Sequence, residues 1–410
     1  MMVRTFFEDL KWRGLVHQTT DESGMGAWLD QGPRTVYAGF DPTADSLHVG
    51  SLVPLLALRR FQQAGHRPIA LVGGATGMIG DPSGKSAERN LLSTEALQAN
   101  VAGLRKQMSS LLDFESSKCG AMLVDNADWM RSFSFIDFLR DVGKNVPVNV
   151  MLAKDSVRSR LERTDVGLSY TEFSYMLLQA YDFVHLHRTY GCELQIGGSD
   201  QWGNVTAGID LARRMDAVSL QGITLPLLTK SDGSKMGKTE KGTIWLDAAR
   251  TSPFEFYQYW VNVADADAGG CLRFLTELPA EEIEALDVAQ LERPHERPSQ
   301  KRLAEALTGL IHGAAGLERA RQATAVLFGA AIENVTDRDL QEIFADVPSC
   351  RLPFARLGGE GLSLVDAFVE AGLCTSKGDA RRMGSQGGLY VNNRQRSEAD
   401  GPLTTADLAS

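Results

Sequence analysis

Tyr37-Ala-Gly-Phe-Asp-Pro-Thr-Ala-Asp-Ser-Leu-His-Val-Gly-Ser51 is the stretch that decides the fold. The apolar, aromatic run at 36–40 predicts a buried strand. Asp41-Pro42 ends that strand, because proline has no N–H for a sheet ladder. Asp45-Ser46 are good N-cap residues for a helix that begins near Leu47. The stretch therefore predicts a strand, a turn and a helix N-terminus, where open α/β sheets commonly bind phosphate-bearing ligands.

The first turn of the predicted helix carries polar side chains suited to a nucleotide. His48 and Ser51 are three residues apart and share one face. Gly50 leaves room for a ligand ring close to the backbone. A lone H-x-G-S match is more often chance than function, so the rest of the chain must decide.

Composition sets the bounds of the answer. At 410 residues, with 43% hydrophobic and 23% charged residues, the chain fits a soluble globular protein of two or three domains. The sequence has no run of about 18 apolar residues, so we expect no membrane-spanning helix. Its first residues lack the pattern of a secretory signal. Five scattered cysteines without a C-x-x-C pair argue against a zinc site or disulfide framework. We expect a cytoplasmic protein, and the net charge of −10 argues against broad nucleic-acid binding.

A second strand, predicted at 67–72, leads into a glycine-rich turn at 73–86. A Walker P-loop would need a glycine at position 79, which is isoleucine. A loop of backbone N–H groups remains, and a solvated turn is an equally good interpretation. Three charged residues lie in or beside it: Asp81, Lys85 and Arg89.

Two later segments also suit a binding site. On a helix predicted over 171–187, Tyr175, Gln179 and Asp182 share one face, which either lines a pocket or is an ordinary solvent face. The segment 193–204 predicts a strand that runs into a glycine turn and a helix, and ligand sites in open α/β sheets lie at such strand ends.

A mobile loop is predicted at 229–239, because glycine, serine and lysine at this density cannot pack a core. Lys235 and Lys238 would bring positive charge to a ligand beneath it, although a solvated lysine pair is the alternative.

The rest of the chain is predicted to contain a helical region followed by a segment rich in basic residues. Ser252-Pro-Phe-Glu255 begins a strand-poor helical region. Between 375 and 396, five basic residues stand against one acid, which suggests either an RNA contact or a solvated basic face. The basic residues are Lys377, Arg381, Arg382, Arg394 and Arg396.

Taken together, these motifs resemble the class I aminoacyl-tRNA synthetases, and the bacterial tyrosyl-tRNA synthetase family in particular. His48-Val-Gly-Ser51 is similar to the HIGH motif, with serine in place of the second histidine. Lys235-Met-Gly-Lys-Thr239 stands where the KMSKS loop belongs, with Gly237 and Thr239 in place of its serines. The resemblance extends from about Tyr37 to Asn393 and includes the segments 80–85 and 198–203.

The resemblance implies an α/β fold with a Rossmann-like parallel-sheet catalytic domain, an α-helical domain and a small α+β S4-like RNA-binding module. The corresponding ranges are 1–228 for the catalytic domain, 229–250 for the KMSKS-type loop, 251–345 for the helical anticodon-binding domain, 346–360 for a linker, and 361–410 for a module that is shorter than expected.

The implied reaction activates L-tyrosine with ATP to tyrosyl-adenylate and pyrophosphate, with Mg²⁺ assisting and no metal site made by the protein. Tyrosine then passes to the 3′-terminal ribose of tRNA(Tyr). The family is homodimeric, and no membrane partner is expected.

The resemblance also assigns site residues. Those expected to act in catalysis are Thr43, His48, Ser51, Lys85, Arg89, Lys235, Lys238 and Thr239. Those expected to bind tyrosine are Tyr37, Asp81, Tyr175, Gln179, Asp182 and Gln201. Those expected to bind ATP are Gly39, Asp41, His48, Gly50, Gly198, Asp200 and Lys238. The five basic residues of the last segment are expected to bind RNA.

Two other functions stay open at this point. One is a different enzyme of the HIGH superfamily, such as a nucleotidyltransferase or the tryptophanyl-tRNA synthetase. The RNA module argues against the first, and the pair of Tyr37 and Asp182 against the second. The other is a synthetase-like RNA-binding or regulatory paralogue, an alternative that Ser51 invites and the remaining site residues oppose.

Overall fold

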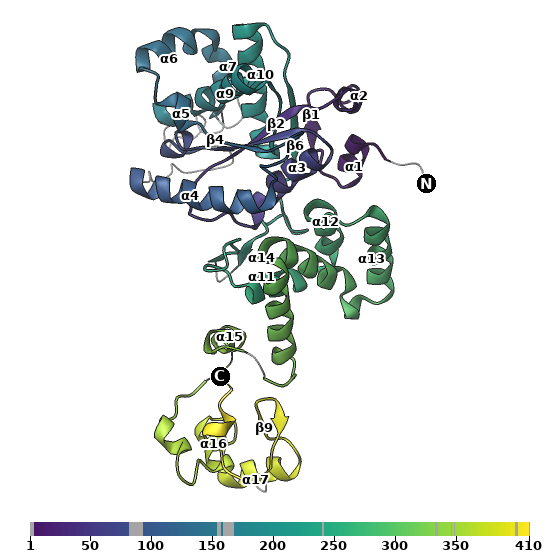
Figure 1. The fold of residues 1–410 in the computed structure, drawn as a ribbon, viewed down its shortest axis with the longest axis vertical. Helices are drawn as coiled ribbons and strands as arrows, with labels where there is room; N and C mark the ends of the chain where they lie inside the picture. Colours follow the sequence, from purple (N-terminus) through teal and green to yellow (C-terminus); the bar gives the residue numbers. More distant parts are fainter. Residues whose placement is uncertain are drawn as a thin grey trace. The chain divides into compact units, whose positions relative to one another are not determined.

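The computed structural model describes residues 4–81, 93–153, 157–158, 168–239, 242–332, 335–345, 347, 349–397 and 401–409. The chain forms two compact units (Figure 1). The first contains residues 1–251 and 262–311, and the second contains residues 252–261 and 312–410. No described helix is both long and apolar enough to cross a membrane.

The first unit is built on a six-stranded sheet in the order β1-β6-β5-β2-β3-β4. Only β1 runs antiparallel to its neighbour, and the other pairings are parallel. The predicted parallel α/β fold is therefore confirmed. The strands are β1 (Gln18–Thr19), β2 (Thr35–Phe40), β3 (Arg67–Val72), β4 (Met122–Asp125), β5 (Cys192–Gly198) and β6 (Gln221–Leu225).

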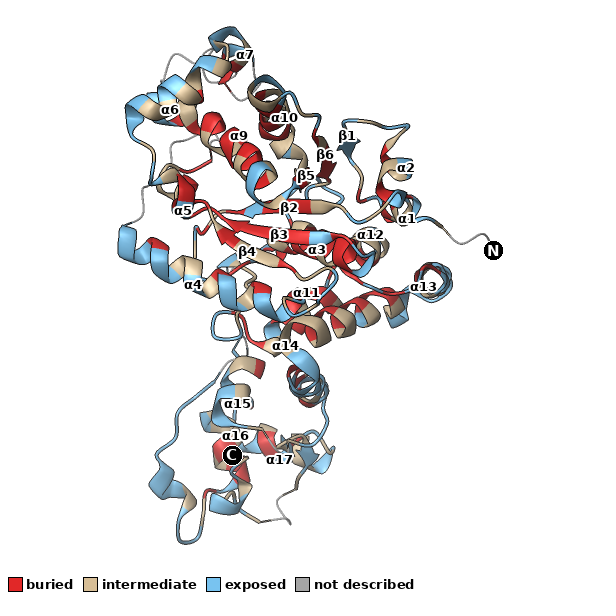
Figure 2. Cartoon of the chain, turned by 45° about the horizontal axis from the view of Figure 1, so that its top comes forward, coloured by how far each residue is buried: buried red, intermediate tan, exposed pale blue. Residues whose placement is uncertain are grey.

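Helices cover both faces of this sheet, as expected for buried apolar strands (Figure 2). On one face lie α3 (Leu52–Gln63) and α4 (Thr94–Leu111), and on the other α9 (Tyr170–Tyr190) and α10 (Trp202–Asp216). The α9 helix begins after the cap Ser169 and ends at Gly191, which adopts a left-handed φ of 64°. The short helices of this unit are α1 (Phe6–Trp12), α2 (Met25–Asp30), α5 (Ala127–Met130), α6 (Phe135–Asp141) and α7 (Val148–Leu152).

The predicted start of the helix after β2 is wrong. His48, rather than Asp45-Ser46, caps a short 3-10 turn, and α3 begins at Leu52. Tertiary pairing overrides the local cap signal, because Leu47 accepts a backbone hydrogen bond from Leu246 at 2.9 Å and so stays extended. Ser46 instead accepts hydrogen bonds from Gln107 and from the backbone of Asp247.

Two buried arginines join the sheet region to α12 (Asp265–Leu275). Arg13 donates to the carbonyl oxygens of Thr276 and Leu278 at 3.2 and 2.9 Å. Arg60 donates to the carbonyl oxygen of Phe274 at 2.9 Å. Burial, followed by the charge of Arg13, lowers the pKa of Arg60 to about 10. These hydrogen bonds connect the sheet to the segment 262–311, which belongs to the first unit. The helical stretch predicted at 251–345 is therefore divided between the two units.

The first unit also contains α13 (Ala280–Glu292) and the start of α14 (Pro298–Leu327). A kink at Gly313, with φ of 71°, lies next to the boundary between Ile311 of the first unit and His312 of the second. The other elements of the second unit are α11 (Pro253–Val261), α15 (Asp337–Ile343), α16 (Leu364–Glu370), α17 (Lys377–Ser385), β9 (Tyr390–Val391) and β10 (Arg394–Gln395). Its last segment packs a small core of Leu364, Val365, Cys374, Ala380 and Leu389.

Candidate active site

A pocket of about 170 Å³ lies at the carboxyl ends of β2 and β5, the two central strands. The chain leaves these strands in opposite directions along the sheet, so this is the switch point where open α/β sheets bind ligands. The pocket brings together all the residues expected to bind tyrosine and three of those expected to bind ATP: Tyr37, Asp81, Tyr175, Gln179, Asp182 and Gln201, and Gly39, Asp41 and Gly198.

One end of the pocket holds a buried carboxylate. Asp182 is 1% exposed and accepts hydrogen bonds from Asn126 Nδ2 at 3.0 Å and from Trp129 Nε1 at 2.9 Å. Burial raises the pKa of Asp182 to about 7, although both donors act in the opposite direction. An isolated buried charge is costly, and these two donors partly offset that cost for the charged form of Asp182.

The Tyr37 hydroxyl faces the same pocket without a partner among the described residues. Its ring packs edge-on against Phe183, with centroids 5.1 Å apart. Burial, then the charge of Asp182, raises the pKa of Tyr37 well above its usual value, so the phenol stays neutral. An unpaired buried hydroxyl carries a free-energy cost, which a ligand hydroxyl at this position would remove.

Three residues that the sequence did not single out complete this end of the pocket. Asn126 and Trp129 follow β4, and their only sequence signal was the polar pair that ends that strand. Gln195 lies in β5 and lines the pocket, and its Oε1 is buried without a partner in the described part of the chain. Its position in the predicted strand at 193–204, between Leu194 and Ile196, was the available signal.

The other end of the pocket is a network of amides around one carboxylate. Gln201 donates to Asp81 at 2.7 Å and accepts from Gln179 at 3.2 Å. Asn204, also missed in the sequence, donates to Gln179 and Gln201 at 3.0 Å each. The Asp81 carboxylate of this network is a suitable partner for a substrate ammonium group.

His48 lies where the strand–turn–helix motif meets the lysine loop. The Val49 amide donates to the carbonyl oxygen of Ile244 at 3.1 Å, and the His48 ring meets the Trp245 ring edge-on. The Gly50 amide donates to His48 Nδ1 at 3.0 Å, which leaves the proton of a neutral ring on Nε2. His48 is exposed, but desolvation of its ring lowers its pKa, and the charges of Lys238 and Lys235 lower it further.

The lysine loop is anchored on α12. The Ser231 amide donates to Asp267 at 2.8 Å, and Met236 is buried against the Cys271 sulfur at 3.6 Å. Gly237 has a left-handed φ of 81°, and a Cβ there would lie 3.1 Å from Val49. The loop ends in a hairpin of β7 (Lys238–Thr239) and β8 (Gly242–Thr243), where the Thr239 hydroxyl donates to Gly242 at 3.1 Å.

One face of α4 supports the turn that follows β2. Asn100 donates to the carbonyl oxygen of Pro42 at 2.9 Å, and Gln107 accepts from the Leu47 amide at 2.7 Å. Gly103 lies between them, and a Cβ there would be only 2.0 Å from the carbonyl oxygen of Asp45. The turn can pack this closely only because position 103 has no side chain.

The remaining expected residues fall into three groups. Thr43 is exposed after β2, Ser51 ends the 3-10 turn, and Asp200 is exposed just after β5. Lys85 and Arg89 lie outside the described residues. The basic residues of the last segment belong to the second unit.

Several of those basic residues have acidic partners. Lys377 pairs with Asp366 at 2.6 Å, and Arg396 pairs with Asp407 at 2.8 Å. Both acids lie outside the window 375–396 that made the segment look strongly basic. Exposed ion pairs are weak, so these side chains can still exchange an acid for a phosphate.

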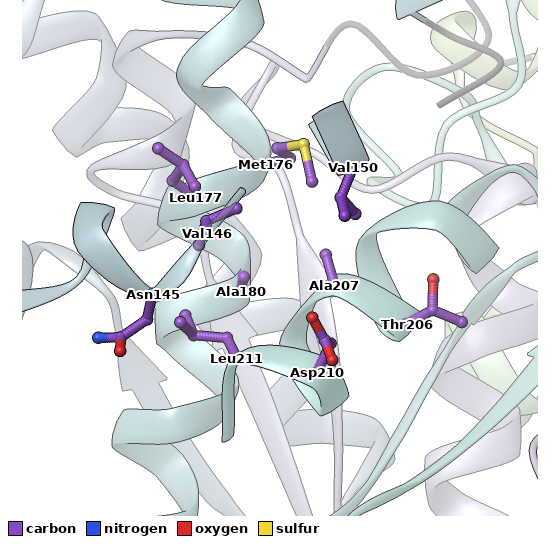
Figure 3. A pocket seen from close by; sticks show the side chains of 10 residues that line it. All are labelled: Asn145, Val146, Val150, Met176, Leu177, Ala180, Thr206, Ala207, Asp210 and Leu211. Atoms are coloured by element: carbon purple, nitrogen blue, oxygen red, sulfur yellow. The ribbon is translucent and has the colours of Figure 1, made fainter. Parts of the chain in front are cut away.

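A second cavity, of about 220 Å³, lies on the opposite side of α9 and is mostly apolar (Figure 3). Its α9 residues, Met176, Leu177 and Ala180, alternate along the helix with Tyr175 and Gln179 of the first pocket. The α9 helix therefore forms a wall of both cavities. The other lining residues are Asn145, Val146, Val150, Thr206, Ala207, Asp210 and Leu211.

A switch-point pocket beside a HIGH-like turn and a lysine loop defines a class I synthetase site. The chain belongs to the class I tRNA synthetases of the tryptophan and tyrosine type, whose family model matches residues 29–329. The model of the tyrosine–tRNA ligase SYY-like C-terminal domain matches residues 339–410. The chain is thus an aminoacyl-tRNA synthetase.

Its relatives agree on the amino acid. The tyrosine–tRNA ligase of Rhodopirellula baltica is 60% identical, over 98% of this chain and 92% of that protein. The tyrosine–tRNA ligase of Roseiflexus castenholzii is 53% identical, over 98% of this chain and 94% of that protein. The fold is similar to a C-terminally truncated mitochondrial tyrosyl-tRNA synthetase from Aspergillus nidulans, with a TM-score of 0.73 and 31% identity over 80% of this chain and 95% of that one.

Proposed function

We propose that this chain is a tyrosine–tRNA ligase, which forms tyrosyl-adenylate from L-tyrosine and ATP and then transfers the tyrosine to tRNA(Tyr). The observation that supports the amino acid most directly is the unpaired, buried Tyr37 hydroxyl in the same pocket as the Asp182 carboxylate. Together they offer one donor and one acceptor to a phenolic hydroxyl. The comparisons do not favour the alternatives of a regulatory paralogue or another nucleotidyltransferase.

In the first step, a tyrosine carboxylate oxygen attacks the α-phosphorus of ATP. The bond to the bridging oxygen breaks, and pyrophosphate leaves with that electron pair. The carboxylate is already a nucleophile, so the protein's task is to hold the reactants in line and to stabilise phosphate charge. His48 donates from Nε2 to a phosphate oxygen, and Thr43 supports the same group.

Positive charge meets the departing pyrophosphate from the lysine loop. Lys235 and Lys238 supply it, together with Lys85 and Arg89, and the Thr239 hydroxyl can add a hydrogen bond. Gly39, Asp41, Gly50 and Gly198 form the nucleotide side of the site, where Asp200 and Ser51 hold the ribose.

The substrate amino acid lies along the pocket with its ammonium group at the amide network. Asp81, Tyr175 and Gln179 bind that group, and Gln201 lies near the carboxylate. The phenolic hydroxyl donates to Asp182 and accepts from Tyr37.

Mg²⁺ assists by neutralising phosphate charge. Among the described residues, no three His, Cys, Asp or Glu side chains are grouped so that they could hold a metal ion. We expect the ion to enter with the nucleotide, because Mg²⁺ in such enzymes is held largely by phosphates and water.

The transfer step requires tRNA, which we assign to the helical anticodon-binding domain at 251–345 and the S4-like module at 361–410. The ribose hydroxyl at the 3′ end of tRNA attacks the adenylate carbonyl, and AMP leaves. Lys377, Arg381, Arg382, Arg394 and Arg396 supply charge for the RNA backbone.

All five cysteines are free thiols, which suits the reducing cytoplasm where we place the enzyme.

A homodimer is also part of the proposal. The α6 helix is largely exposed (Figure 2) and, with α7 and the start of α9, carries large apolar side chains that a second copy would cover. Sedimentation of the full chain tests this, and Ile136→Asp should shift a dimer towards monomer. A wild-type protein that sediments only as monomer at micromolar concentration would contradict it. The exposed side chains are Phe135, Ile136, Leu139, Val148, Leu152 and Tyr170.

The test of the reaction is ATP–pyrophosphate exchange without tRNA, with tyrosine, phenylalanine and tryptophan compared side by side. Exchange supported by tyrosine, and far less by the other two, is expected. Exchange with none of them would favour the regulatory paralogue, and exchange driven by tryptophan would overturn the assigned amino acid.

A further inference from the structure

We propose that His185 is a positioning residue for tyrosine recognition, because it holds the Trp129 indole so that its N–H stays on the Asp182 carboxylate. This inference rests on the proposed function, since it concerns the group that binds the substrate phenol. His185 is not among the described residues that line the pocket, so it acts on the substrate phenol through Trp129 and Asp182.

The geometry places one indole between two residues of the same helix. Asp182 and His185 are three apart on α9, so they share a face. Asp182 accepts from the edge of Trp129 at 2.9 Å, and His185 stacks on its face with ring centroids 4.3 Å apart and planes 14° apart. Trp129 is 7% exposed, so a rotated indole would leave its N–H buried away from its acceptor.

The two donors to Asp182 are supported in different ways. Asn126 has its own hydrogen bonds: its amide donates to Thr76 at 2.9 Å and accepts from the Ala75 backbone at 2.8 Å. Trp129 donates only through its single N–H. It stands on α5, a helix of only four residues, which is a weak support for a large ring. The stack with His185 therefore supplies the orientation that α5 does not.

His185 is itself suited to this role. The Thr189 hydroxyl lies 3.3 Å from its Nε2, one helical turn away. Burial, then the charge of Arg188, lowers the pKa of His185, which keeps a flat neutral ring against the indole near pH 7. The Tyr181 ring lies farther off, at 6.4 Å, so the indole is the main ring contact.

Three variants separate this role from general destabilisation. His185→Ala removes the stack, His185→Phe keeps it without ring nitrogens, and His187→Ala is a matched control two residues along α9. The control histidine is hydrogen-bonded to the Cys192 carbonyl at 3.0 Å. Two measurements are made on the full-length protein. The first is the ratio of kcat/KM for tyrosine to that for phenylalanine in pyrophosphate exchange. The second is the ¹⁹F NMR signal of Trp129 after 5-fluorotryptophan labelling, assigned with Trp129→Phe.

We expect His185→Ala to lower the ratio about three- to tenfold, as for loss of an aromatic pair. The change should appear mainly in the KM for tyrosine, and the Trp129 signal should shift. His185→Phe should keep both within about twofold of wild type, and His187→Ala should change neither.

Two results would overturn the role of His185. One is an unchanged ratio and an unchanged Trp129 signal in His185→Ala. The other is an equal loss for tyrosine and phenylalanine, which marks a purely structural residue. The wild-type protein tests the function separately, because absence of tyrosine-dependent exchange would refute the ligase itself and the recognition role with it.

Discussion

At the scale of single residues, the proposed recognition of tyrosine depends on two buried polar groups. Tyr37→Phe removes a hydroxyl that has no partner in the described protein, and Asp182→Ala removes the acceptor. We expect each to reduce the preference for tyrosine over phenylalanine, by about tenfold or more for Tyr37→Phe, because a buried hydrogen bond to a ligand is worth about 1–3 kcal/mol when one partner is left unpaired. The ratio of kcat/KM values for the two amino acids measures it.

Replacement of Ser51 by alanine is a useful comparison, since this residue lies in the turn before α3 and outside the phenol end of the pocket. It should leave the preference unchanged. Unchanged selectivity in both Tyr37→Phe and Asp182→Ala would contradict the assigned pocket.

The ionisation of Asp182 gives a pH-dependent prediction. Its folded pKa, about 7, lies above the ordinary aspartate value of 3.8, so the folded state binds this proton more tightly than the unfolded state does. The stability cost of the charge therefore grows as the pH rises from about 4 to about 7 and then levels off. Asp182→Asn removes this cost, so its melting temperature relative to wild type should rise between pH 5 and pH 7 without ligands.

Asp216 is the matched control. Its hydrogen bonds to Arg188 lower its pKa, so the charge is already complete at pH 5. Asp216→Asn should therefore give a difference in melting temperature that is nearly constant from pH 5 to pH 8. A constant difference for Asp182→Asn as well would show that the buried carboxylate does not titrate in this range.

At the scale of elements, the α4 helix packs against the turn at 41–47, which follows β2. Gly103→Ala would place a Cβ 2.0 Å from the carbonyl oxygen of Asp45, a backbone atom that cannot rotate away. We expect a loss of about 1–3 kcal/mol of stability, together with a higher KM for ATP, because the turn at 41–47 must move. Thermal unfolding and exchange at varied ATP concentration measure the two effects.

Gly270→Ala is the control for helix propensity, because position 270 lies inside α12 and a Cβ there meets nothing within 4 Å. It should be neutral or stabilising by up to about 1 kcal/mol. If Gly103→Ala behaved the same way, the close packing of α4 on the turn would be refuted.

How far the sequence predicted these elements depends on the range of the forces involved. The central strands and α9 follow from local apolar runs, caps and breakers, and the structure contains them. The start of α3 and the two-residue strand β1 depend on partners about 200 residues away, namely Leu246 and β6, which no local pattern can show. In the same way, a family resemblance led us to expect Tyr37 and Asp182 in one pocket, which both of them line. The supporting residues Asn126, Trp129 and Asn204 become evident only from three-dimensional contacts.

At the scale of the whole molecule, the two steps of the reaction should be separable. Deletion of residues 360–410 removes the S4-like module but no residue of the pocket at β2 and β5. We expect tyrosine-dependent pyrophosphate exchange to stay within about twofold of the full chain, and tRNA charging to fall by about tenfold or more, because phosphate contacts supply much of the affinity for nucleic acids.

The full-length protein in rising salt gives an independent check, since its charging should weaken while exchange changes little. Equal charging by the truncated and full-length chains would remove the module from tRNA binding.

The buried arginines of the first unit also affect how this chain folds while it is being translated. Arg13 and Arg60 emerge early from the ribosome, but their carbonyl acceptors lie at residues 274–278. Until those residues are translated, the nascent sheet carries two cations that must remain hydrated rather than buried. The catalytic unit of this synthetase is therefore expected to reach its final packing late in translation, after most of the chain that forms it has been made.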